Sequence, residues 1–368
     1  MFLIKFTIAL IAVACATASP LFNETNVGAN CVITQFSQVG SVTKSCNNIV
    51  VQNLAVPAGK QLLLNLKSGT TLTFKGTTSF GYGVQWEGPM VLIKGNHLTV
   101  DGSGATLDGQ GAHYWDGKGD SGNNKPKFFR IQAQSSTFSN IHLLNCPKQC
   151  TSVLNSNSVT LDKWNIDVSA GDRNHLGHNT DGFDVSASSG VTIKNSVVKN
   201  QDDCVALNSG SNIHIDNLDC SGGHGLSISV GVSKTDSTKN RLSDVTFSNS
   251  VVKNSRNGIH IKTHTDGAVG YMKDITYTNI KFQGLTNYGI NVQENYKGGK
   301  SSGSPVGNIP IHGLKLNNIR GTMTGKDSEA VYVLCGSKGC DNFNWSGVSI
   351  TGAHKSSYCN YKPSGYPC

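Results

Sequence analysis

Short β-rich runs recur along most of the chain, and long stretches of helical periodicity are absent. The gaps between runs, about 20 to 40 residues, are typical of a solenoid of stacked coils rather than of tight hairpins. Several runs are followed by Asn, as at Lys194-Asn195 and Asp216-Asn217, which suits sharp turns between stacked strands. The runs are Val159-Thr160-Leu161, Val191-Thr192-Ile193, Ile213-His214-Ile215, Val245-Thr246-Phe247, Ile275-Thr276-Tyr277 and Leu314-Lys315-Leu316.

A second repeat consists of a small residue, an apolar residue, a variable residue and another apolar residue. Strict alternation in a strand buries the two apolar positions and turns the variable position outward. The segments are Gly182-Phe183-Asp184-Val185, Cys204-Val205-Ala206-Leu207, Gly225-Leu226-Ser227-Ile228, Gly258-Ile259-His260-Ile261 and Gly289-Ile290-Asn291-Val292. Both repeats predict an all-β chain that forms a single-domain parallel β-helix.

The five residues that directly precede these segments are the most informative part of the second repeat. They are Asp181, Asp203, His224, Asn257 and Tyr288, whose numbers differ successively by 22, 21, 33 and 31. Each is therefore expected to occupy the same place on a successive coil, with coils about 4.8 Å apart. Asp184, His260 and Lys262 are expected to project beside this ladder.

The ladder is rich in titratable groups, which a purely structural solenoid does not require. Carboxylates and an imidazole on neighbouring coils shift one another's proton affinity, as hydrolytic sites need. A structural explanation is that Asp and Asn occupy turns for backbone reasons, and for a single Asp we favour it. For Asp181, Asp202, Asp203 and His224 together, we favour a catalytic site.

The N-terminus reads as an export signal. An apolar run containing Lys5 extends from Phe2 to Ala14, is followed by small residues, and is shorter than the roughly 20 residues of a membrane span. We therefore expect residues 1–18 to be a signal peptide and residues 19–368 to form one β-helix domain, secreted and without a membrane partner.

The cysteine count agrees with export. Cys15 would leave with the signal, so 10 of the 11 cysteines remain, and an even count in a secreted chain indicates disulfides. The sequons at Asn23 and Asn344 are candidate glycosylation sites. Spacing suggests local pairs, although sequence alone does not fix the connectivity: Cys31 with Cys46, Cys146 with Cys150, Cys204 with Cys220, Cys335 with Cys340, and Cys359 with Cys368.

The net charge is +8, from 31 Lys and Arg against 23 Asp and Glu, and it would attract a polyanion. The chain has no helix-turn-helix pattern, RNA-binding signature or dense basic run, so nucleic acid is not the expected partner. An acidic polysaccharide fits better, although a basic surface that serves only solubility explains the charge equally well.

At the ladder residues the sequence resembles the polygalacturonase family of glycoside hydrolases, specifically its compact fungal-type members. The matching motifs are Asn179-Thr180-Asp181-Gly182-Phe183-Asp184, Gln201-Asp202-Asp203-Cys204, Gly223-His224-Gly225 and Asn287-Tyr288-Gly289-Ile290. The similarity runs from about Cys31 to Cys368 and includes four of the five expected disulfides. The pair Cys146 and Cys150 is additional to the family pattern.

The resemblance implies a right-handed β-helix that hydrolyses α-1,4 bonds between galacturonate units of pectin with inversion. Endo attack is favoured, and exo attack is the open alternative. It implies that Asp202 is the general acid, that Asp181 and Asp203 activate water, and that His224 tunes their protonation. Lys262, His260, Tyr288 and Asn179 would bind the sugar acid. The resemblance implies no metal or cofactor, and we expect a monomer.

Adjacent Asp202 and Asp203 would face opposite ways in a regular strand. Both can reach one cleft only if the backbone bends before the segment that begins at Cys204. A Cys204–Cys220 disulfide would brace that bend, closing a loop worth about 3 kcal/mol in the chain-entropy model.

The chain departs from the family at one position, because His260-Ile261-Lys262 stands where the family has Arg-Ile-Lys. Arginine is permanently charged and grips a carboxylate with two parallel hydrogen bonds, whereas histidine is mostly neutral near pH 7. Two hypotheses follow: a hydrolase with weaker galacturonate binding, better activity at low pH or a preference for modified pectin, or a catalytically impaired pectin binder. We favour the hydrolase because each candidate carboxylate is present.

Two other classes of protein are alternatives. Pectate lyases also use parallel β-helices, but they typically need calcium and a basic residue, which this ladder of acids does not supply. A non-enzymatic surface protein that holds cell-wall polymer would show binding without turnover. A metal site at Asp203, Cys204 and His224 is disfavoured because Cys204 is assigned to a disulfide.

Overall fold

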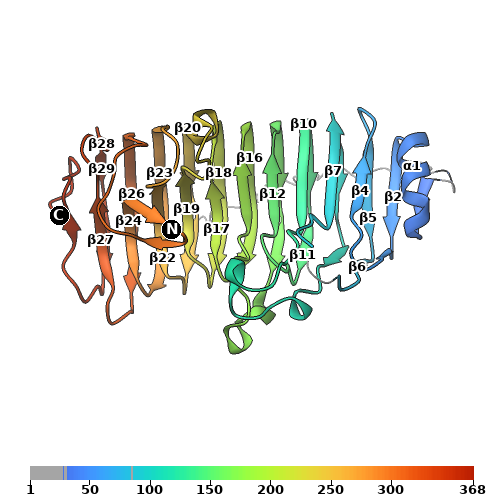
Figure 1. Ribbon diagram of the computed structural model, residues 1–368, viewed down its shortest axis with the longest axis horizontal. Coiled ribbons are helices and arrows are strands. Elements are labelled where there is room, and N and C mark those ends of the chain that lie inside the picture. Colours follow the sequence, from blue (N-terminus) through green and yellow to red (C-terminus); the bar gives the residue numbers. More distant parts are fainter. Residues whose placement is uncertain (1–27, 29–30, 84–85) are drawn as a thin grey trace, which may run out of the picture.

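The computed structural model describes Gly28 and residues 31–83 and 86–368. The predicted signal peptide, Cys15 and the sequon at Asn23 lie outside the described residues. Over the described chain the strands join into one sheet that winds in successive coils along a single axis (Figure 1). The predicted right-handed parallel β-helix is confirmed.

Each coil contributes strands to three parallel stacks. The first stack contains β4 (Leu62–Asn65), β7 (Val91–Asn96), β10 (Phe129–Ser139), β12 (Thr151–Leu154), β15 (Phe183–Ser186), β17 (Asp203–Leu207), β19 (Gly225–Val230), β22 (Asn257–His264), β24 (Tyr288–Lys297), β27 (Glu329–Leu334) and β31 (Tyr358–Cys359). A short strand, β25 (Lys300–Ser301), pairs antiparallel with β24.

The second stack contains β1 (Val32–Ile33), β2 (Asn48–Gln52), β5 (Thr71–Lys75), β8 (Thr99–Asp101), the second half of β10, β13 (Asn157–Asp162), β16 (Ser188–Lys199), β18 (Gly210–Ser221), β20 (Arg241–Ser248), β23 (Tyr271–Leu285), β26 (Ile311–Met323), β28 (Cys340–Asp341) and β29 (Asn344–Ser346).

The third stack contains β3 (Ala55–Val56), β6 (Thr77–Phe80), β9 (Thr106–Asp108), β11 (His142–Leu144), β14 (Asn165–Asp167), β21 (Val251–Lys253), β30 (Ser349–Thr351) and the C-terminal parts of β16, β18, β23 and β26.

The strand register confirms both sequence repeats. The six β-rich runs align rung by rung in the second stack, in the order Val159, Val191, Ile213, Val245, Ile275 and Leu314. The five glycine- or cysteine-led segments align in the first stack, in the order Phe183, Val205, Leu226, Ile259 and Ile290. Their apolar positions are buried and form the continuous core of the coil.

An asparagine ladder marks the turn between the second and third stacks. Its members, Asn195, Asn217, Asn249, Asn279 and Asn318, all have φ between 50° and 54°. Asparagine tolerates this left-handed conformation better than most residues. The side chains also bond along the ladder: Asn217 Nδ2 donates to Asn195 Oδ1 (2.9 Å), and Asn279 Nδ2 donates to Asn249 Oδ1 (3.1 Å).

The two ends of the coil are closed differently. At the N-terminal end, helix α1 (Val39–Ser45) packs Val42 over the first coils, and Figure 1 shows it beyond β2. At the C-terminal end the rings of Phe343 and Tyr361 pack 4.9 Å apart. The described part of the chain has no helix with the length and hydropathy of a membrane span.

All five expected disulfides are present, which confirms the local pairing, including the additional Cys146–Cys150 bond. The Cys204–Cys220 bond joins β17 to β18 of the same coil, with the two Cα atoms 5.9 Å apart. The sequon residue Asn344 lies in β29 and is exposed, so a glycan there would not disturb the core.

Candidate active site

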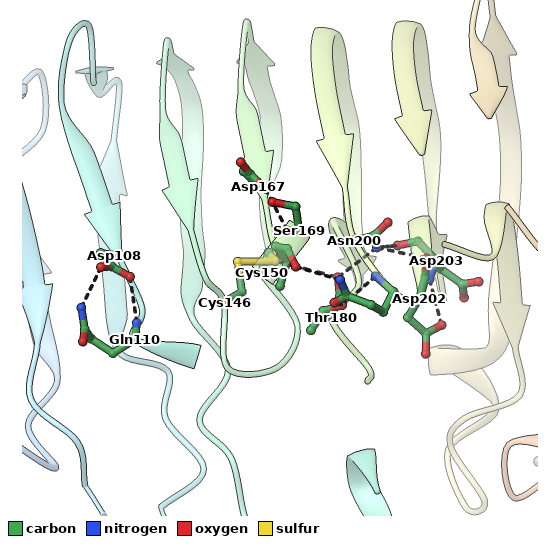
Figure 2. The surroundings of a disulfide bond; sticks show 12 residues. Asp108, Gln110, Cys146, Cys150, Asp167, Ser169, Thr180, Asn200, Asp202 and Asp203 are labelled. Atoms are coloured by element: carbon green, nitrogen blue, oxygen red, sulfur yellow. Dashed lines mark hydrogen bonds between the residues drawn. A yellow bond between two sulfur atoms is a disulfide. The ribbon is translucent and has the colours of Figure 1, made fainter. Parts of the chain in front are cut away.

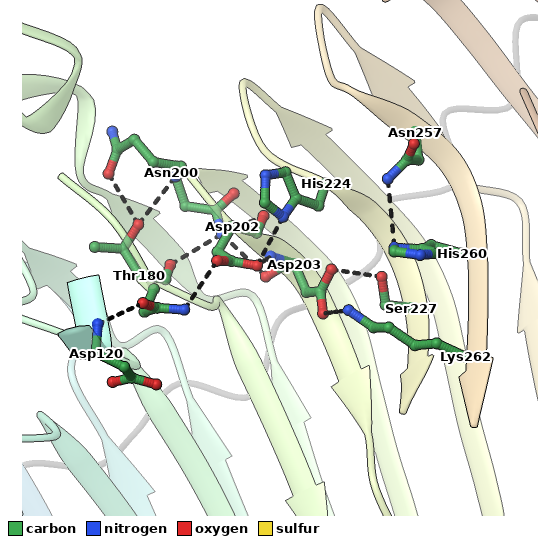
Figure 3. Close-up of polar contacts among 12 residues, drawn as sticks. Asp120, Thr180, Asn200, Asp202, Asp203, His224, Ser227, Asn257, His260 and Lys262 are labelled. Atoms are coloured by element: carbon green, nitrogen blue, oxygen red, sulfur yellow. Dashed lines mark hydrogen bonds and ion pairs between the residues drawn. The ribbon is translucent and has the colours of Figure 1, made fainter. Parts of the chain in front are cut away.

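A cleft of about 830 Å³ lies over the first stack, lined by residues from β10 to β24. The sequence-predicted residues Asp181, Asp202, Asp203 and His224 all line it, together with Asn179 and Lys262. One side-chain oxygen or nitrogen atom from each of Asp202, Asp203 and His224 lies within 4.8 Å of the other two. Coil stacking therefore brings residues from separate motifs into one site, as Figure 3 shows for the residues it labels.

The backbone bend expected before Cys204 appears as a bulge in β17. Asp203 pairs with Gly225, whereas Val205 pairs with Leu226, so one residue of β17 is extra. This shift corrects the predicted ladder, because Asp203 does not lie opposite His224. Bulges re-aim side chains, and here the result is that Asp202 and Asp203 both reach the cleft.

Asn200 holds this bend, and sequence reasoning missed it. The side chain is fully buried, and its Nδ2 lies 2.9 Å from the carbonyl of Thr180 and 3.0 Å from those of Asp202 and Asp203. Figure 2 shows these contacts next to the Cys146–Cys150 disulfide. A buried amide that bonds several carbonyls fixes the backbone on which the two carboxylates stand.

Asp202 is held as an ionised carboxylate. His224 Nδ1 lies 2.9 Å from Asp202 Oδ1, and Asn179 Nδ2 donates to Oδ2 (3.2 Å). Burial opposes ionisation, but the charge and hydrogen bond of His224 outweigh it and lower the pKa of Asp202. Burial also disfavours the charged form of His224, but the charge and hydrogen bond of Asp202 outweigh this effect and raise the pKa of His224. Without substrate, the two side chains form an ion pair.

Asp203 forms a second ion pair, which is almost completely buried. Lys262 Nζ lies 2.9 Å from Asp203 Oδ2, and the two side chains are 6% and 4% exposed. Ser227 Oγ donates to the other oxygen of Asp203 (2.6 Å). Despite burial, Asp203 raises the pKa of Lys262, so the lysine stays charged. The cleft floor thus holds a fixed cation directly beside the carboxylates.

Asp181 and Asp184 differ from these two pairs because one oxygen of each is buried without a described hydrogen-bond partner. Burial, and after it the charge of Asp202, raises the pKa of Asp181 well above its usual value. Burial raises the pKa of Asp184 to about 7, although Lys127 opposes the shift. The cleft therefore combines a carboxylate whose charged form is favoured, Asp202, with two carboxyls, Asp181 and Asp184, whose protonated form is favoured relative to a free carboxyl.

His260 is buried, with 8% of its surface exposed, and does not line the cleft. Its Nδ1 lies 3.3 Å from Asn257 Nδ2, while its Nε2 has no described partner. Burial, followed by Lys262, lowers its pKa well below the usual value, so the ring is neutral. Burial beside Lys262 thus disfavours the charged form of His260, in contrast to the permanent charge of an arginine.

A family model described as glycosyl hydrolases family 28 matches residues 46–368. The chain belongs to this family. It is 52% identical to a polygalacturonase of Phaedon cochleariae, over 98% of this chain and 100% of that protein. It is 46% identical to a polygalacturonase of Cochliobolus carbonum, over 92% of each chain.

The structural comparison agrees with the family. The fold matches endopolygalacturonase I of Stereum purpureum, solved in complex with two galacturonates, at a TM-score of 0.81 and 32% identity. The match covers 91% of this chain and 99% of that one. Family membership and the aligned coils make the chain a glycoside hydrolase.

The cleft of this family 28 enzyme also contains residues that sequence reasoning missed, notably Tyr296 and His264. Tyr296 places its ring 5.2 Å from Lys262 Nζ, whereas the predicted Tyr288 does not line the cleft and instead packs against Tyr332. His264 Nε2 lies 3.0 Å from Ser229 Oγ. Strict alternation from Asn291 would turn Tyr296 inward, and the register shift between the pairs Lys262–Gln293 and His264–Tyr296 is what alternation could not predict. His264 continues the outward alternation of His260 and Lys262, so that pattern would have pointed to it.

Two groups of described residues lie close enough together to hold a cation. Asp202, Asp203 and His224 form one, but their atoms already contact one another, Lys262 and Ser227. Glu294, Cys335 and Cys340 form the other, and both its sulfurs are in a disulfide, so neither is a thiolate. Neither group supplies a set of free ligands.

Proposed function

We propose that this family 28 enzyme hydrolyses α-1,4-galacturonosyl bonds in polygalacturonate and pectin. The observation that carries the proposal is the convergence of Asp181, Asp202, Asp203 and His224 in one cleft with the buried cation Lys262. A glycosidic bond needs one protonated carboxyl for its leaving oxygen and one carboxylate for a water. A fixed cation in the same cleft favours a sugar that carries a carboxylate.

In the proposed mechanism, Asp202 donates the proton to the leaving oxygen. Its ion pair with His224 supplies a route, because the hydrogen bond between them spans 2.9 Å. Substrate that displaces water from the cleft disfavours two separate charges, so it favours transfer of the His224 proton to Asp202. The pair then enters the reaction as a neutral acid and a neutral imidazole.

Asp181 and Asp203 position and activate the attacking water. Asp203 is fixed by Lys262 and Ser227, whereas Asp181 has an oxygen with no described partner. Such an oxygen is available to a water or to a sugar hydroxyl. Attack opposite to the leaving group inverts the anomeric carbon, which is the outcome implied by the family resemblance.

Substrate contacts are assigned first to three of the residues that line the cleft: Lys262, Asn179 and Tyr296. The binding roles of His260 and Tyr288 stay predictions. The lining extends to both sides of the two carboxylates, from Arg130 in β10 to Tyr296 in β24. A cleft that continues past the reacting bond in both directions suits attack within a chain.

The chain is proposed to act outside the cell as a monomer. Its five disulfides are typical of proteins that fold in an oxidising compartment. Its acidic polysaccharide partner and net charge of +8 agree with that setting.

The test is product analysis on demethylated polygalacturonate across pH 4 to 8. Hydrolysis releases reducing ends and a series of oligomers without the ultraviolet absorbance of an unsaturated product, and it is insensitive to EDTA. Asp202→Asn should lower the release about a thousandfold. An absorbing, EDTA-sensitive product would instead indicate a lyase.

One observation favours a second candidate, a pectin binder without turnover. His260 is neutral and buried where an arginine would be charged, so the cleft has lost one cation for holding the sugar acid. Wild-type protein that binds polygalacturonate but releases no more ends than Asp202→Asn would support this candidate. If the hydrolase proposal holds, His260→Arg should increase turnover of demethylated substrate.

A further inference from the structure

The cleft continues beyond the catalytic carboxylates toward the N-terminal end of the coil, where its lining changes from acidic to basic. Lys127, Arg130, Gln149 and Ser152 line this part. Arg130 in β10 pairs with Ser152 in β12, which pairs with Asp184 in β15. Since β15 pairs with β17, Arg130 lies three coils before the reacting carboxylates, a distance of about 14 Å.

Arg130 and Lys127 are cations without a counter-ion. Neither side chain forms an ion pair or hydrogen bond with a described residue, and Arg130 Nε is buried without a partner. Both interact electrostatically with Asp184. Burial raises the pKa of that carboxyl to about 7, so it is a weaker counter-ion than an ordinary aspartate. Leaving a partly buried guanidinium unpaired costs free energy.

Other lysines in and around the cleft are paired. Lys262 bonds Asp203, Lys239 lies 3.5 Å from Asp236, and Lys125 lies 2.8 Å from Asp116. The unpaired state of Arg130 and Lys127 is therefore a local feature of the N-terminal part of the cleft. An anionic ligand that enters the cleft would supply the missing partner.

We infer that Arg130 and Lys127 form a carboxylate-binding subsite for a galacturonate unit about three sugars from the reacting bond. The inference rests on the proposed function. A planar guanidinium can bind a carboxylate through two parallel hydrogen bonds, which gives orientation as well as affinity. A pyranose unit advances a polymer by a distance comparable to the coil spacing, so units and coils stay nearly in step.

The neighbouring loop completes the subsite. Gln149 Oε1 is buried and has no described partner, so it can accept a hydrogen bond from a sugar hydroxyl. Gln149 lies inside the small loop closed by Cys146 and Cys150. This additional disulfide restricts the loop that carries Gln149, which lowers the ordering cost of binding.

The subsite makes a prediction about substrate length. A sugar bound three units away contributes equally to the ground state and the transition state, so it lowers KM without raising kcat. Only oligomers long enough to reach Arg130 benefit, and only if the distant unit carries a free carboxylate.

The experiment measures oligogalacturonate binding by calorimetry in the Asp202→Asn background, over increasing oligomer length. Arg130→Gln should weaken binding of long oligomers about tenfold and leave short ones unchanged. Arg130→Lys should retain part of the affinity, and Lys127→Gln should show the same length dependence. Esterifying the long oligomers should remove the difference between the Arg130→Gln variant and its parent. Arg320→Gln, at an exposed position in β26, is the matched control and should have no effect.

The outcomes separate the subsite from the proposed function. If wild-type protein cleaves polygalacturonate but Arg130→Gln and Lys127→Gln bind all oligomers as the parent does, the subsite is wrong and the function stands. Equal weakening at every length, or the same loss on esterified oligomers, also contradicts a distant carboxylate site. Wild-type protein that neither binds nor cleaves overturns both. Thermal unfolding of each variant shows whether the fold is retained.

Discussion

The asparagine ladder and the cleft occupy two sides of the same coils, yet they follow opposite rules. In the ladder each rung resembles the next, and amides bond between neighbouring coils, as Asn217 does with Asn195. In the cleft each rung differs, and buried oxygens of Asp181 and Asp184 have no described partner. Satisfied repetition gives the coil its rigidity, and breaks in the repetition supply unpaired groups for chemistry.

The largest effect on the contrast between cleft and ladder is expected for Asp202→Asn. This change removes the proposed acid but keeps the shape of the side chain, so activity on polygalacturonate should fall about a thousandfold, within the range for acid–base groups. Thermal stability should change little. Asp216→Asn is the matched control, since Asp216 accepts from Asn249 on the ladder side (2.7 Å), and it should keep full activity. Similar activity in both variants would contradict the assignment of chemistry to the cleft and of a structural role to the ladder.

Lys262→Met tests whether the cleft also contributes to stability. Removing the lysine leaves Asp203 as a buried, unpaired charge, so the free energy of unfolding should fall by about 3–5 kcal/mol. Chemical denaturation measures the change. The double variant with Asp203→Asn removes both charges and should recover part of the loss. Equal stability of the single and double variants would show that the pair is not coupled.

A smaller effect is expected for Asn217→Ala on the ladder. Alanine loses the bond to Asn195 and strains the backbone, whose φ is 53°, so unfolding should become easier by roughly 1–2 kcal/mol. Asn217→Gly keeps the conformation without strain and should be destabilised less. Activity should stay at the wild-type level in both, and a large loss of activity would contradict a purely structural ladder.

The smallest effect concerns the pH dependence of stability. The folded pKa of His224 is raised above 6.5, so its stabilising contribution is full below that value and is lost as pH rises through the folded pKa. The folded pKa of Asp202 is lowered, so its contribution is present above about 3.8 and is lost on acidification. The Tm difference between wild type and His224→Gln should therefore be largest between these values. A difference that is constant with pH would exclude the ion pair.

Much of the fold was predictable because the second stack repeats a simple pattern. Runs such as Val159-Thr160-Leu161 and Val191-Thr192-Ile193 alternate and end near a turn, and their register is the predicted one. The disulfides were predictable because each pair is local in sequence. The bulge at Asp203 shifted the ladder by one residue, which a fixed repeat cannot anticipate.

Site residues that stand in recognisable motifs were predictable from the sequence. Site residues that reach the cleft only through strand register were not. Asp181, Asp202 and His224 stand in dense motifs, and the structure brings them into one cleft. Arg130 and Tyr296 belong to ordinary strand sequences, and only the register places them beside the acids. Arg130 could have been found by continuing the alternation backward through Phe129-Arg130-Ile131, where two apolar residues flank an outward one.

Helix α1 has a consequence for assembly. A parallel coil ends in a row of backbone amides and carbonyls that could template another molecule and propagate into filaments. The packing of Val42 on the first coils places a helix, rather than another strand edge, across that end. The N-terminal end of the coil therefore offers fewer free backbone groups to a second molecule.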